Sequence, residues 1–468
     1  MQLKLKFLGA AQNVTGSRHL IQANGTRLLV DCGLYQERHF KERNWEPFEV
    51  PPESIDAVLL THAHLDHCGL LPKLSKEGFK GKIYGTSATA EIARIILMDS
   101  AKLQEEDAQY KRKRHEKEDR KGPYPEIPLY TIADVEACCP LFSPVKYKQP
   151  VKIGNDLEAT FYDAGHVLGS SIIRIKAQIN GQDRTVLFSG DMGRPDRPIV
   201  KDPTSFEQAD YILIESTYGD RVHQAKEDTK KMIAEVINST KQAGGNIIIP
   251  SFALERSQEL LYYINELLLE GAIPHLMVFL DSPMAAGITK VFQKHRELFD
   301  KEMAEHIRHD ESPFNFPGLK MTGTSEESKA INHIKGTVII IAGSGMCTGG
   351  RIKHHLVNNI TKPKNTIMFI GYQAVGTLGR QIVDGKKEVR ILGQVYPVNA
   401  KIVRINGFSA HADRDELFNW LSGFKKTPRK IFIVHGEPES AKHFGDYIRE
   451  KTGWKVAVPA YLDEIVLD

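Results

Sequence analysis

This chain of 468 residues contains only five cysteines and three tryptophans, and its net charge is only +3. The cysteine count is odd, and Cys138 and Cys139 are adjacent, so no disulfide framework is predicted. We therefore expect a reduced, cytoplasmic protein. The near balance of charge neither requires nor excludes nucleic acid as a partner, and any basic groove has to be local.

Long apolar runs are also missing. None approaches the ~20 apolar residues that a membrane helix needs. Residues 1–7 alternate between apolar and polar types, which is typical of a strand rather than of a signal peptide. Internal repeats and low-complexity segments are missing too. With 41% hydrophobic and 26% charged residues, the composition is that of a globular protein, and no membrane partner is expected.

Short apolar runs recur along the chain with helical stretches between them, and five of the nine runs are followed directly by Gly, Ser, Asp or His. The runs are residues 27–30, 55–60, 186–188, 211–214, 246–249, 276–280, 337–341, 366–370 and 430–434. This pattern predicts an α/β fold whose polar chemistry lies at the carboxyl ends of strands. The length allows two or more domains. The residues that separate strands from helices differ in type past Ala209, where we expect a second domain to begin.

A dense run of both charge signs covers residues 102–121 and includes four consecutive basic residues, 111–114. One interpretation is a basic clamp for nucleic acid. Acidic residues are nearly as frequent in the run, so a solvated helix is the favoured interpretation.

The most informative segment is residues 61–69, which follows the apolar run 55–60. Its ligand-type side chains are His62, His64, Asp66 and His67. Residues two apart in an extended chain share a side, so His62 and His64 are able to reach one ion. A turn into a helix would direct Asp66 and His67 at a second ion. Imidazole nitrogen and carboxylate oxygen are ligands that zinc accepts.

Three later segments add one ligand-type side chain each. His166 lies in a glycine-bounded loop, Asp191 follows the run 186–188, and His435 ends the run 430–434. Each alone is weak, because a histidine at a strand end is more often a structural residue. Together with the first four they make seven candidate ligands, a number that suits two metals with an open position for water. Asp31, which ends a further strand, is expected to orient a ligand histidine.

The ordered set of these residues resembles the metallo-β-lactamase superfamily. The later segments resemble its β-CASP branch of nucleic-acid-processing nucleases, which includes the nuclease of the mRNA 3′-end cleavage factor and prokaryotic ribonucleases. Glu215 in Ile-Glu-Ser-Thr-Tyr-Gly resembles motif A of that branch, His411 in Phe-Ser-Ala-His-Ala-Asp resembles motif B, and His435 resembles motif C. The motifs occur in the right order over essentially the whole chain.

The resemblance implies a four-layer αββα sandwich with an inserted α/β β-CASP domain. We expect residues 1–208 to begin the sandwich, residues 209–400 to form the β-CASP domain, and residues 401–468 to complete the sandwich. It also implies two Zn²⁺ ions. One is held by His62, His64 and His166, the other by Asp66, His67 and His435, and Asp191 bridges them.

The resemblance further implies a ribonuclease that hydrolyses phosphodiester bonds of RNA, in processing or decay, with a metal-bound hydroxide. A histidine at motif C accompanies RNA enzymes in this branch, whereas DNA-repair members usually have valine there. We expect Asp66, Glu215 and His411 to be catalytic, with His411 protonating the departing ribose oxygen and Glu215 keeping it protonated. The alternatives are that Glu215 caps the next turn and that His411 only begins a helix.

Candidate substrate contacts lie mostly in the second domain. The glycine-rich residues 342–351 follow a strand, and their backbone N–H groups suit phosphate oxygens. The alternative is a tight turn that packs the domains. The candidate contacts are Ser344, Gly345, Arg351, Arg256, Arg380 and Ser409. Arg256 and Arg380 are equally candidates for ion pairs. Such contacts would give salt-sensitive binding of single-stranded RNA with little sequence preference.

Three other functions compete with the ribonuclease. A DNA nuclease of the same branch has the same metal site. A hydrolase of small thioesters or lactams is disfavoured by the extra domain, which suits a polymer. A non-catalytic scaffold subunit is disfavoured because the ligand set is complete. Endonuclease and 5′-to-3′ exonuclease action are both compatible with the motifs, as are a homodimer and an RNA-processing complex.

Overall fold

The computed structural model describes residues 2–118, 125–179, 181–223, 229–308 and 312–468. The chain divides into two compact units. The first unit comprises Met1–Asp196, Lys201–Val222 and His411–Asp468, and the second comprises Arg197–Val200 and His223–Ala410. The chain therefore enters the second unit twice, briefly at Arg197–Val200 and then at His223–Ala410, and its last segment belongs to the first unit.

The first unit contains two seven-stranded sheets. The first sheet has the order β22 (Glu464–Leu467), β1 (Leu3–Gly9), β2 (Arg18–Ala23), β3 (Thr26–Val30), β4 (Ala57–Leu59), β5 (Lys82–Thr86), β6 (Phe142–Val145). The second has the order β21 (Val456–Ala457), β20 (Lys430–Val434), β11 (Tyr211–Glu215), β10 (Gln182–Phe188), β9 (Ser171–Ile179), β8 (Leu157–Asp163), β7 (Pro150–Ile153).

The two sheets pack face to face around one core. Leu5 and Phe7 of β1 share this core with Phe161, Phe188 and Phe432 from the second sheet, and all are buried. Along β1 the buried Leu3, Leu5 and Phe7 alternate with the half-buried Lys4 and Lys6, as expected for a strand with one face on a core. The packing of the two inner faces makes a sandwich.

Helices cover the outer faces of the sandwich. Residues of α12 (Arg414–Ser422) and α13 (Pro438–Thr452) pack with Ile212 and Ile214 of β11. Near β5 and β6 lie α1 (Leu65–Cys68), α2 (Leu71–Lys76), α3 (Ser87–Glu118) and α4 (Ile132–Cys138). The helix–sheet–sheet–helix order confirms the predicted αββα sandwich.

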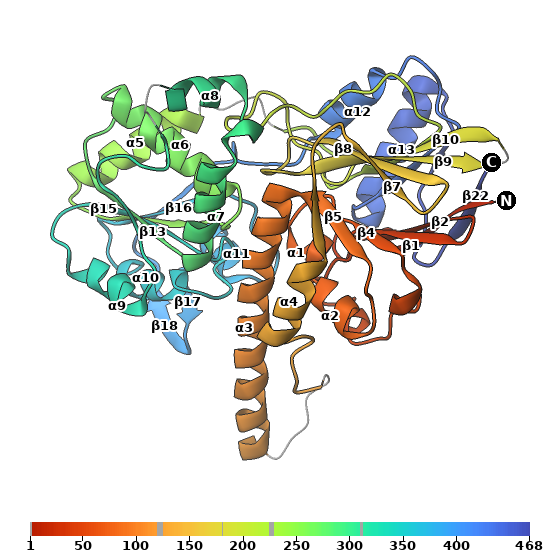
Figure 1. Cartoon of the computed structure of the whole chain (residues 1–468). Helices are drawn as coiled ribbons and strands as arrows, with labels where there is room; N and C mark the ends of the chain where they lie inside the picture. Colours follow the sequence, from red (N-terminus) through yellow and green to blue (C-terminus); the bar gives the residue numbers. More distant parts are fainter. Residues whose placement is uncertain (1, 119–124, 180, 224–228, 309–311) are drawn as a thin grey trace. The chain divides into compact units, whose positions relative to one another are not determined.

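The charged run forms the distal part of α3, which extends beyond the other elements of the first unit (Figure 1). Lys111 pairs with Asp107 at 2.6 Å and Arg114 with Glu118 at 2.8 Å, each one turn apart. These pairs fit the solvated-helix interpretation. Residues 119–121 of the run lie outside the described residues.

The second unit is built on a parallel sheet of six strands. Its order is β14 (Leu319–Met321), β13 (Met277–Asp281), β15 (Val338–Ala342), β12 (Ile247–Pro250), β16 (Thr366–Phe369), β19 (Lys401–Arg404). A hairpin, β17 (Glu388–Ile391) and β18 (Gln394–Pro397), follows β16 in the chain. This arrangement confirms an α/β second domain.

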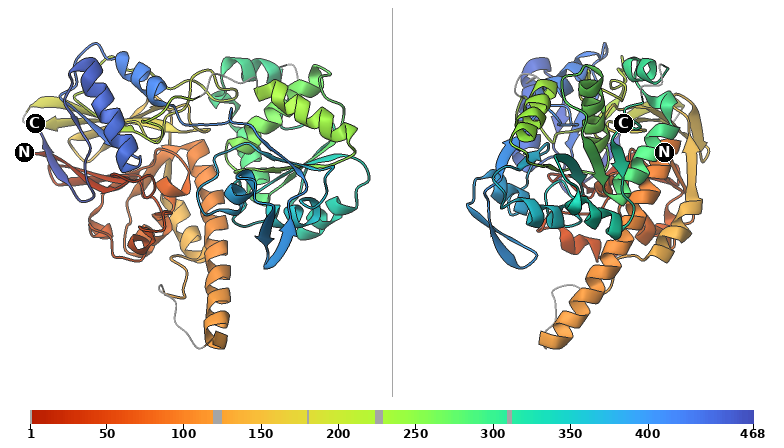
Figure 2. Two further views of the ribbon diagram at one scale, coloured as in Figure 1. Left: turned by 180° about the vertical axis from the view of Figure 1, so that it is seen from behind. Right: turned by 90° about the vertical axis from the view of Figure 1, so that its left-hand side faces the viewer.

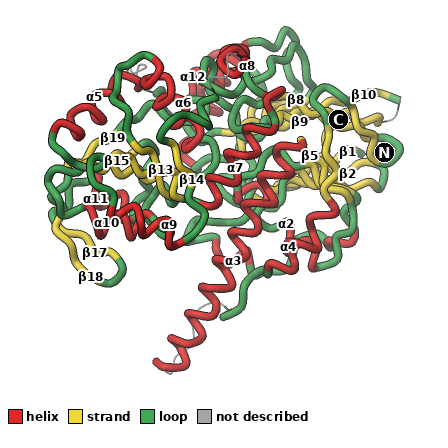
Figure 3. Tube along the Cα trace, turned by 60° about the vertical axis from the view of Figure 1, so that its left-hand side comes forward, coloured by secondary structure: helices red, strands yellow, loops and turns green. Residues whose placement is uncertain are grey.

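Helices lie on both faces of this sheet (Figures 1 and 2). Residues of α10 (Ile352–Asn359) and α11 (Leu378–Val383) share a buried core with one face. The other helices are α5 (Thr229–Gln242), α6 (Arg256–Leu269), α7 (Pro283–Lys294), α8 (Lys301–Arg308) and α9 (Ser325–Ala330). Figure 3 shows the alternation of helix and strand that the sequence pattern indicated.

Strand pairing explains where the two units begin and end. Residues 209–222 belong to the first unit because β11 pairs with β10 and β20 of its second sheet. Residues 401–410 belong to the second unit, where β19 pairs with β16. Among the helices of the described ranges, none is long and apolar enough to cross a membrane. All five cysteines are free thiols.

Candidate metal centre

The first part of the site is built by the loops that follow β3 and β4. Two backbone hydrogen bonds hold α1: the N–H of Ser17, directly before β2, donates to Asp66 O at 2.8 Å, and the N–H of Cys32, in the loop after β3, donates to His67 O at 2.7 Å. This close approach requires glycine at position 33, where a Cβ would lie 1.7 Å from the carbonyl oxygen of Asp66. Local backbone contacts therefore hold Asp66 and His67 in place.

The structure brings His62, His64, His166 and Asp191 together, with one ligand atom of each within 4.8 Å of the others. His64 Nδ1 lies 3.0 Å from His62 Nε2 and 3.3 Å from His166 Nε2. Asp191 Oδ2 lies 3.5 Å from His62 Nε2 and 3.6 Å from His166 Nε2. Three imidazoles and one carboxylate converging in this way suit a zinc ion.

A second group contains Asp66, His67 and His435. His67 Nε2 lies 3.1 Å from His435 Nε2, and His435 Nε2 lies 3.6 Å from Asp66 Oδ2. Asp191 reaches this group with its other oxygen, Oδ1, which lies 3.2 Å from His67 Nε2 and 3.5 Å from His435 Nε2. Asp191 thus contacts both groups, and its buried Oδ1 accepts no hydrogen bond. A buried carboxylate that contacts both groups of ligand-type side chains fits a bound cation in each group.

The electrostatics of the two groups differ. Burial lowers the pKa of His62 well below its usual value and that of His64 to about 4, so both imidazoles are neutral and able to bind a metal. Burial also acts to lower the pKa of His435, but Asp191 and Asp66 raise it to about 9. The carboxylates therefore create a negative potential that favours positive charge at the second group.

Asp31 fixes the orientation of the His67 ring through a hydrogen bond to Nδ1. His67 Nδ1 donates to Asp31 Oδ2 at 2.7 Å, and the N–H and hydroxyl of Thr61 each donate to Asp31 at 2.8 Å. With Nδ1 engaged, His67 presents Nε2 to the metal site, an arrangement typical of metal-ligating histidines. Asp31 and His435 both have left-handed backbones, with φ of +60° and +51°, which marks two strained residues at this site.

Glu215 and His411 form a pair next to Asp191. His411 Nδ1 lies 3.1 Å from Glu215 Oε2, and His411 Nε2 lies 3.9 Å from Asp191 Oδ2. Glu215 is fully buried and accepts the N–H of Met192 at 2.6 Å. Burial alone would lower the pKa of His411, but Glu215 and then Asp191 raise it above its ordinary value. The helix α12 begins only at Arg414, so His411 precedes it.

The candidate arginines of the second unit contact carboxylates of that unit. Arg351 donates to Asp281 at 2.7 Å, Arg380 donates to Asp384 at 2.8 Å, and Arg256 lies 3.8 Å from Glu259. Ser344 Oγ accepts the N–H of Thr348 within the glycine-rich loop, and Gly345 lies against the ring of Phe252. Ser409 also belongs to the second unit, two residues before His411.

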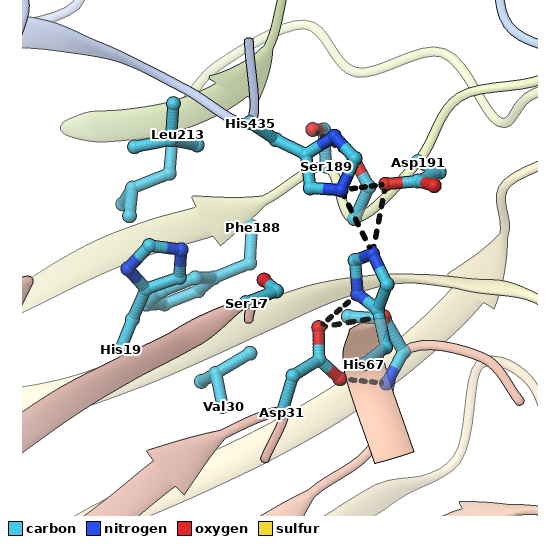
Figure 4. Close-up of a pocket in the computed structure, with 13 residues that line it drawn as sticks. Ser17, His19, Val30, Asp31, His67, Phe188, Ser189, Asp191, Leu213 and His435 are labelled. Atoms are coloured by element: carbon cyan, nitrogen blue, oxygen red, sulfur yellow. Dashed lines mark hydrogen bonds and ion pairs between the residues drawn. The ribbon is translucent and has the colours of Figure 1, made fainter. Parts of the chain in front are cut away.

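His19 was not singled out by its sequence context. It lies on the inner face of β2, where it borders a cavity of about 20 Å³ with Asp31, His67, Asp191 and His435 (Figure 4). Its Nδ1 is buried without a hydrogen-bond partner, and burial, with His67 and His435, lowers its pKa to about 3. A single histidine in a strand is common and does not by itself predict a site. The only signal in the sequence was that His19 directly precedes the apolar residues of a strand, so that its side chain could be buried.

Three family models match the chain. A metallo-β-lactamase superfamily domain matches residues 20–188, a Beta-Casp domain matches residues 257–382, and a Zn-dependent metallo-hydrolase RNA specificity domain matches residues 395–459. The fold also resembles a solved structure of a protein of unknown function from Enterococcus faecalis, with a TM-score of 0.58, 11% identity and full coverage of both chains. That likeness concerns the fold alone.

Two curated relatives align with most of the chain. Ribonuclease TTHA0252 of Thermus thermophilus is 39% identical over 95% of this chain and 95% of the relative. Transcription termination factor FttA of Methanocaldococcus jannaschii is 32% identical over 99% of this chain and 71% of the relative. With a donor set that suits a metal cofactor and these matches along its length, the chain belongs to the β-CASP family of the metallo-β-lactamase superfamily.

Proposed function

We propose that this protein is a zinc-dependent ribonuclease that hydrolyses phosphodiester bonds of single-stranded RNA. The observation that carries the proposal is the convergence of His435 on Asp66, His67 and Asp191, with the Glu215–His411 pair next to the same carboxylate. The relatives named as a ribonuclease and a transcription termination factor, and the match to an RNA specificity domain, support RNA as the substrate.

Two zinc ions are the proposed cofactors. His62, His64 and His166 would hold one, Asp66, His67 and His435 the other, and Asp191 would touch both. Bound zinc makes a water-derived nucleophile available at neutral pH and neutralises phosphate charge. Asp191 and the imidazoles would hold the ions, and the hydrogen bond to Asp31 keeps Nε2 of His67 turned toward Asp191 and His435.

His411 is the proposed general acid. Its Nδ1 faces Glu215, so the proton on Nε2 points toward Asp191 and the metal groups. Glu215 favours the protonated ring, which would give its Nε2 proton to the departing ribose oxygen. Such general acid catalysis is typically worth about 10²–10⁴-fold in rate. Asp66 would contribute to catalysis through the ion it binds.

The decisive experiment incubates zinc-loaded protein with 5′-labelled single-stranded RNA and with DNA of the same sequence. We expect RNA cleavage that a chelator abolishes and added zinc restores. Mononucleotides at the first time point would indicate 5′-to-3′ exonuclease action, and internal fragments would indicate an endonuclease. Preferential cleavage of DNA would replace the proposal with a DNA nuclease, and zinc-free protein with no cleavage would favour a scaffold subunit.

A further inference from the structure

The sheet of the second unit has a point at which its connections diverge, between β12 and β16. From β12 the chain proceeds to β13 on one side, whereas from β16 it proceeds to β19 on the other side. Loops that leave neighbouring parallel strands in opposite directions open a crevice at the carboxyl edge of the sheet. Ligands of open α/β sheets bind in such crevices.

Phe252 stands at this point, in the loop that follows β12. Its side chain is 38% exposed, although it is a large apolar residue. The ring rests on backbone from the two neighbouring loops. A Cβ at Gly345, after β15, would lie 2.6 Å from Phe252 Cδ2, and one at Gly371, after β16, would lie 3.6 Å from Phe252 Cε2. Glycine at both positions allows the ring to lie directly on the main chain.

A buried side chain fastens these loops to each other. Gln373 is only 4% exposed, and its Nε2 donates to Gly345 O at 3.0 Å and to Gly371 O at 3.2 Å. The backbone of Phe252 is held as well, because Ser257 Oγ donates to its carbonyl oxygen at 2.7 Å. The support beneath the ring is therefore assembled in advance, so a ligand would not have to order these loops.

Apolar exposure continues along the loop after β16. Tyr372, directly after Gly371, is 52% exposed, and Val375 is 82% exposed. A fixed aromatic ring that is supported by glycines and open to solvent suits a flat aromatic ligand. Every nucleobase has such a face, and stacking on protein aromatics is tolerant of base identity.

We propose that Phe252 stacks against an unpaired base of the RNA substrate. This inference rests on the proposed ribonuclease function and adds how the chain would select its substrate. A base within a duplex is already stacked on both faces, so the site would favour single-stranded segments without reading their sequence. Phe252 is thus a specificity-determining residue, outside the metal centre.

The test is a cycle that combines a protein change with a change in the RNA. Intact RNA is compared with a set of RNAs that each lack one base, and wild-type protein with Phe252→Leu, all as zinc-loaded full chains. We expect Phe252→Leu to raise KM for intact RNA about 5- to 150-fold with little change in kcat. Phe252→Tyr, which keeps a stacking ring, should restore the wild-type KM.

The RNA that lacks the stacked base identifies the contact. For that RNA we expect Phe252→Leu to leave KM unchanged. For every other RNA of the set the substitution should still raise KM. Ile334→Ala is the matched control, since Ile334 is 37% exposed in the same unit. An unchanged KM in Phe252→Leu would overturn the stacking contact. So would a rise in KM of the same size on the intact RNA and on every RNA that lacks one base. A wild-type protein that neither binds nor cuts RNA would overturn the ribonuclease proposal and this inference together.

Discussion

His67 Nδ1 lies 2.7 Å from Asp31 Oδ2, and both residues are almost completely buried. The same ring presents Nε2 to His435 and Asp191 on its other side. One carboxylate at the end of β3 therefore sets the direction in which a proposed ligand on α1 points.

Asp31→Asn should weaken zinc binding about 10- to 100-fold, because the amide no longer fixes the ring orientation and basicity of His67. Zinc affinity is measured by competition with a chelator of known affinity. Asp56→Asn is the matched control: Asp56 also accepts a backbone N–H, that of Arg27, but it lies in an exposed setting away from the site. Unchanged zinc affinity in Asp31→Asn would show that His67 needs no such partner.

His411→Ala and His64→Ala should fail in different ways. His411→Ala removes the proposed general acid, so we expect turnover to fall by about 10²–10⁴-fold while zinc content stays near that of the wild type. His64→Ala removes a proposed ligand from the first group, so zinc content should fall together with turnover. Zinc per chain and RNA cleavage are measured on the same samples. Equal zinc loss in the two variants would contradict the assignment of His411.

Glu215→Gln should shift the pH dependence of kcat. Glu215 raises the pKa of His411, and a general acid acts only while it is protonated. Activity that depends on this proton is present below the pKa of His411 and is lost as the pH rises through it. Without the Glu215 charge that pKa falls, so the alkaline limb of the profile should move to lower pH. If the alkaline limb of the kcat profile does not move, that limb reports the titration of a group other than His411.

Asp281 should control the stability of the second unit. It is fully buried and accepts hydrogen bonds from Arg351 at 2.7 Å, His355 at 2.5 Å and Ser328 at 2.5 Å. Asp281→Asn should lower the free energy of unfolding by about 3–5 kcal/mol, as for removal of one partner of a buried ion pair. The control Asp384→Asn breaks the exposed pair with Arg380 and should cost about 0–1 kcal/mol.

The pH dependence of unfolding provides a second measure of the same carboxylate. Burial acts to raise the pKa of Asp281, but His355, Ser328, Thr322 and Arg351 together lower it below its ordinary value. Its contribution is therefore present above the unfolded-state pKa of about 3.9 and is lost as the pH falls below that value. Urea unfolding at pH 7 and at pH 3 should show a smaller difference between the wild type and Asp281→Asn at the lower pH.

Local patterns in the chain were enough to predict the four ligand-type residues of the first motif. His62, His64, Asp66 and His67 are neighbours in the chain, so strand geometry and the following helical turn restrict where they can point. The same holds for the fold class, since apolar runs of strand length between helical stretches leave few arrangements that bury them.

The convergence of His435 on that motif depends on the tertiary structure. Val434 pairs with Glu215 across β20 and β11, and His435 N–H donates to Ala10 O at 2.8 Å, so long-range strand pairing places this imidazole. The sequence near a strand does not show which distant strand will pair with it, because a buried strand is an apolar run whatever its neighbour in the sheet is. The partner of Arg351 and the inward position of His19 depend on packing in the same way: whether a charged or polar side chain is engaged follows from what folds against it.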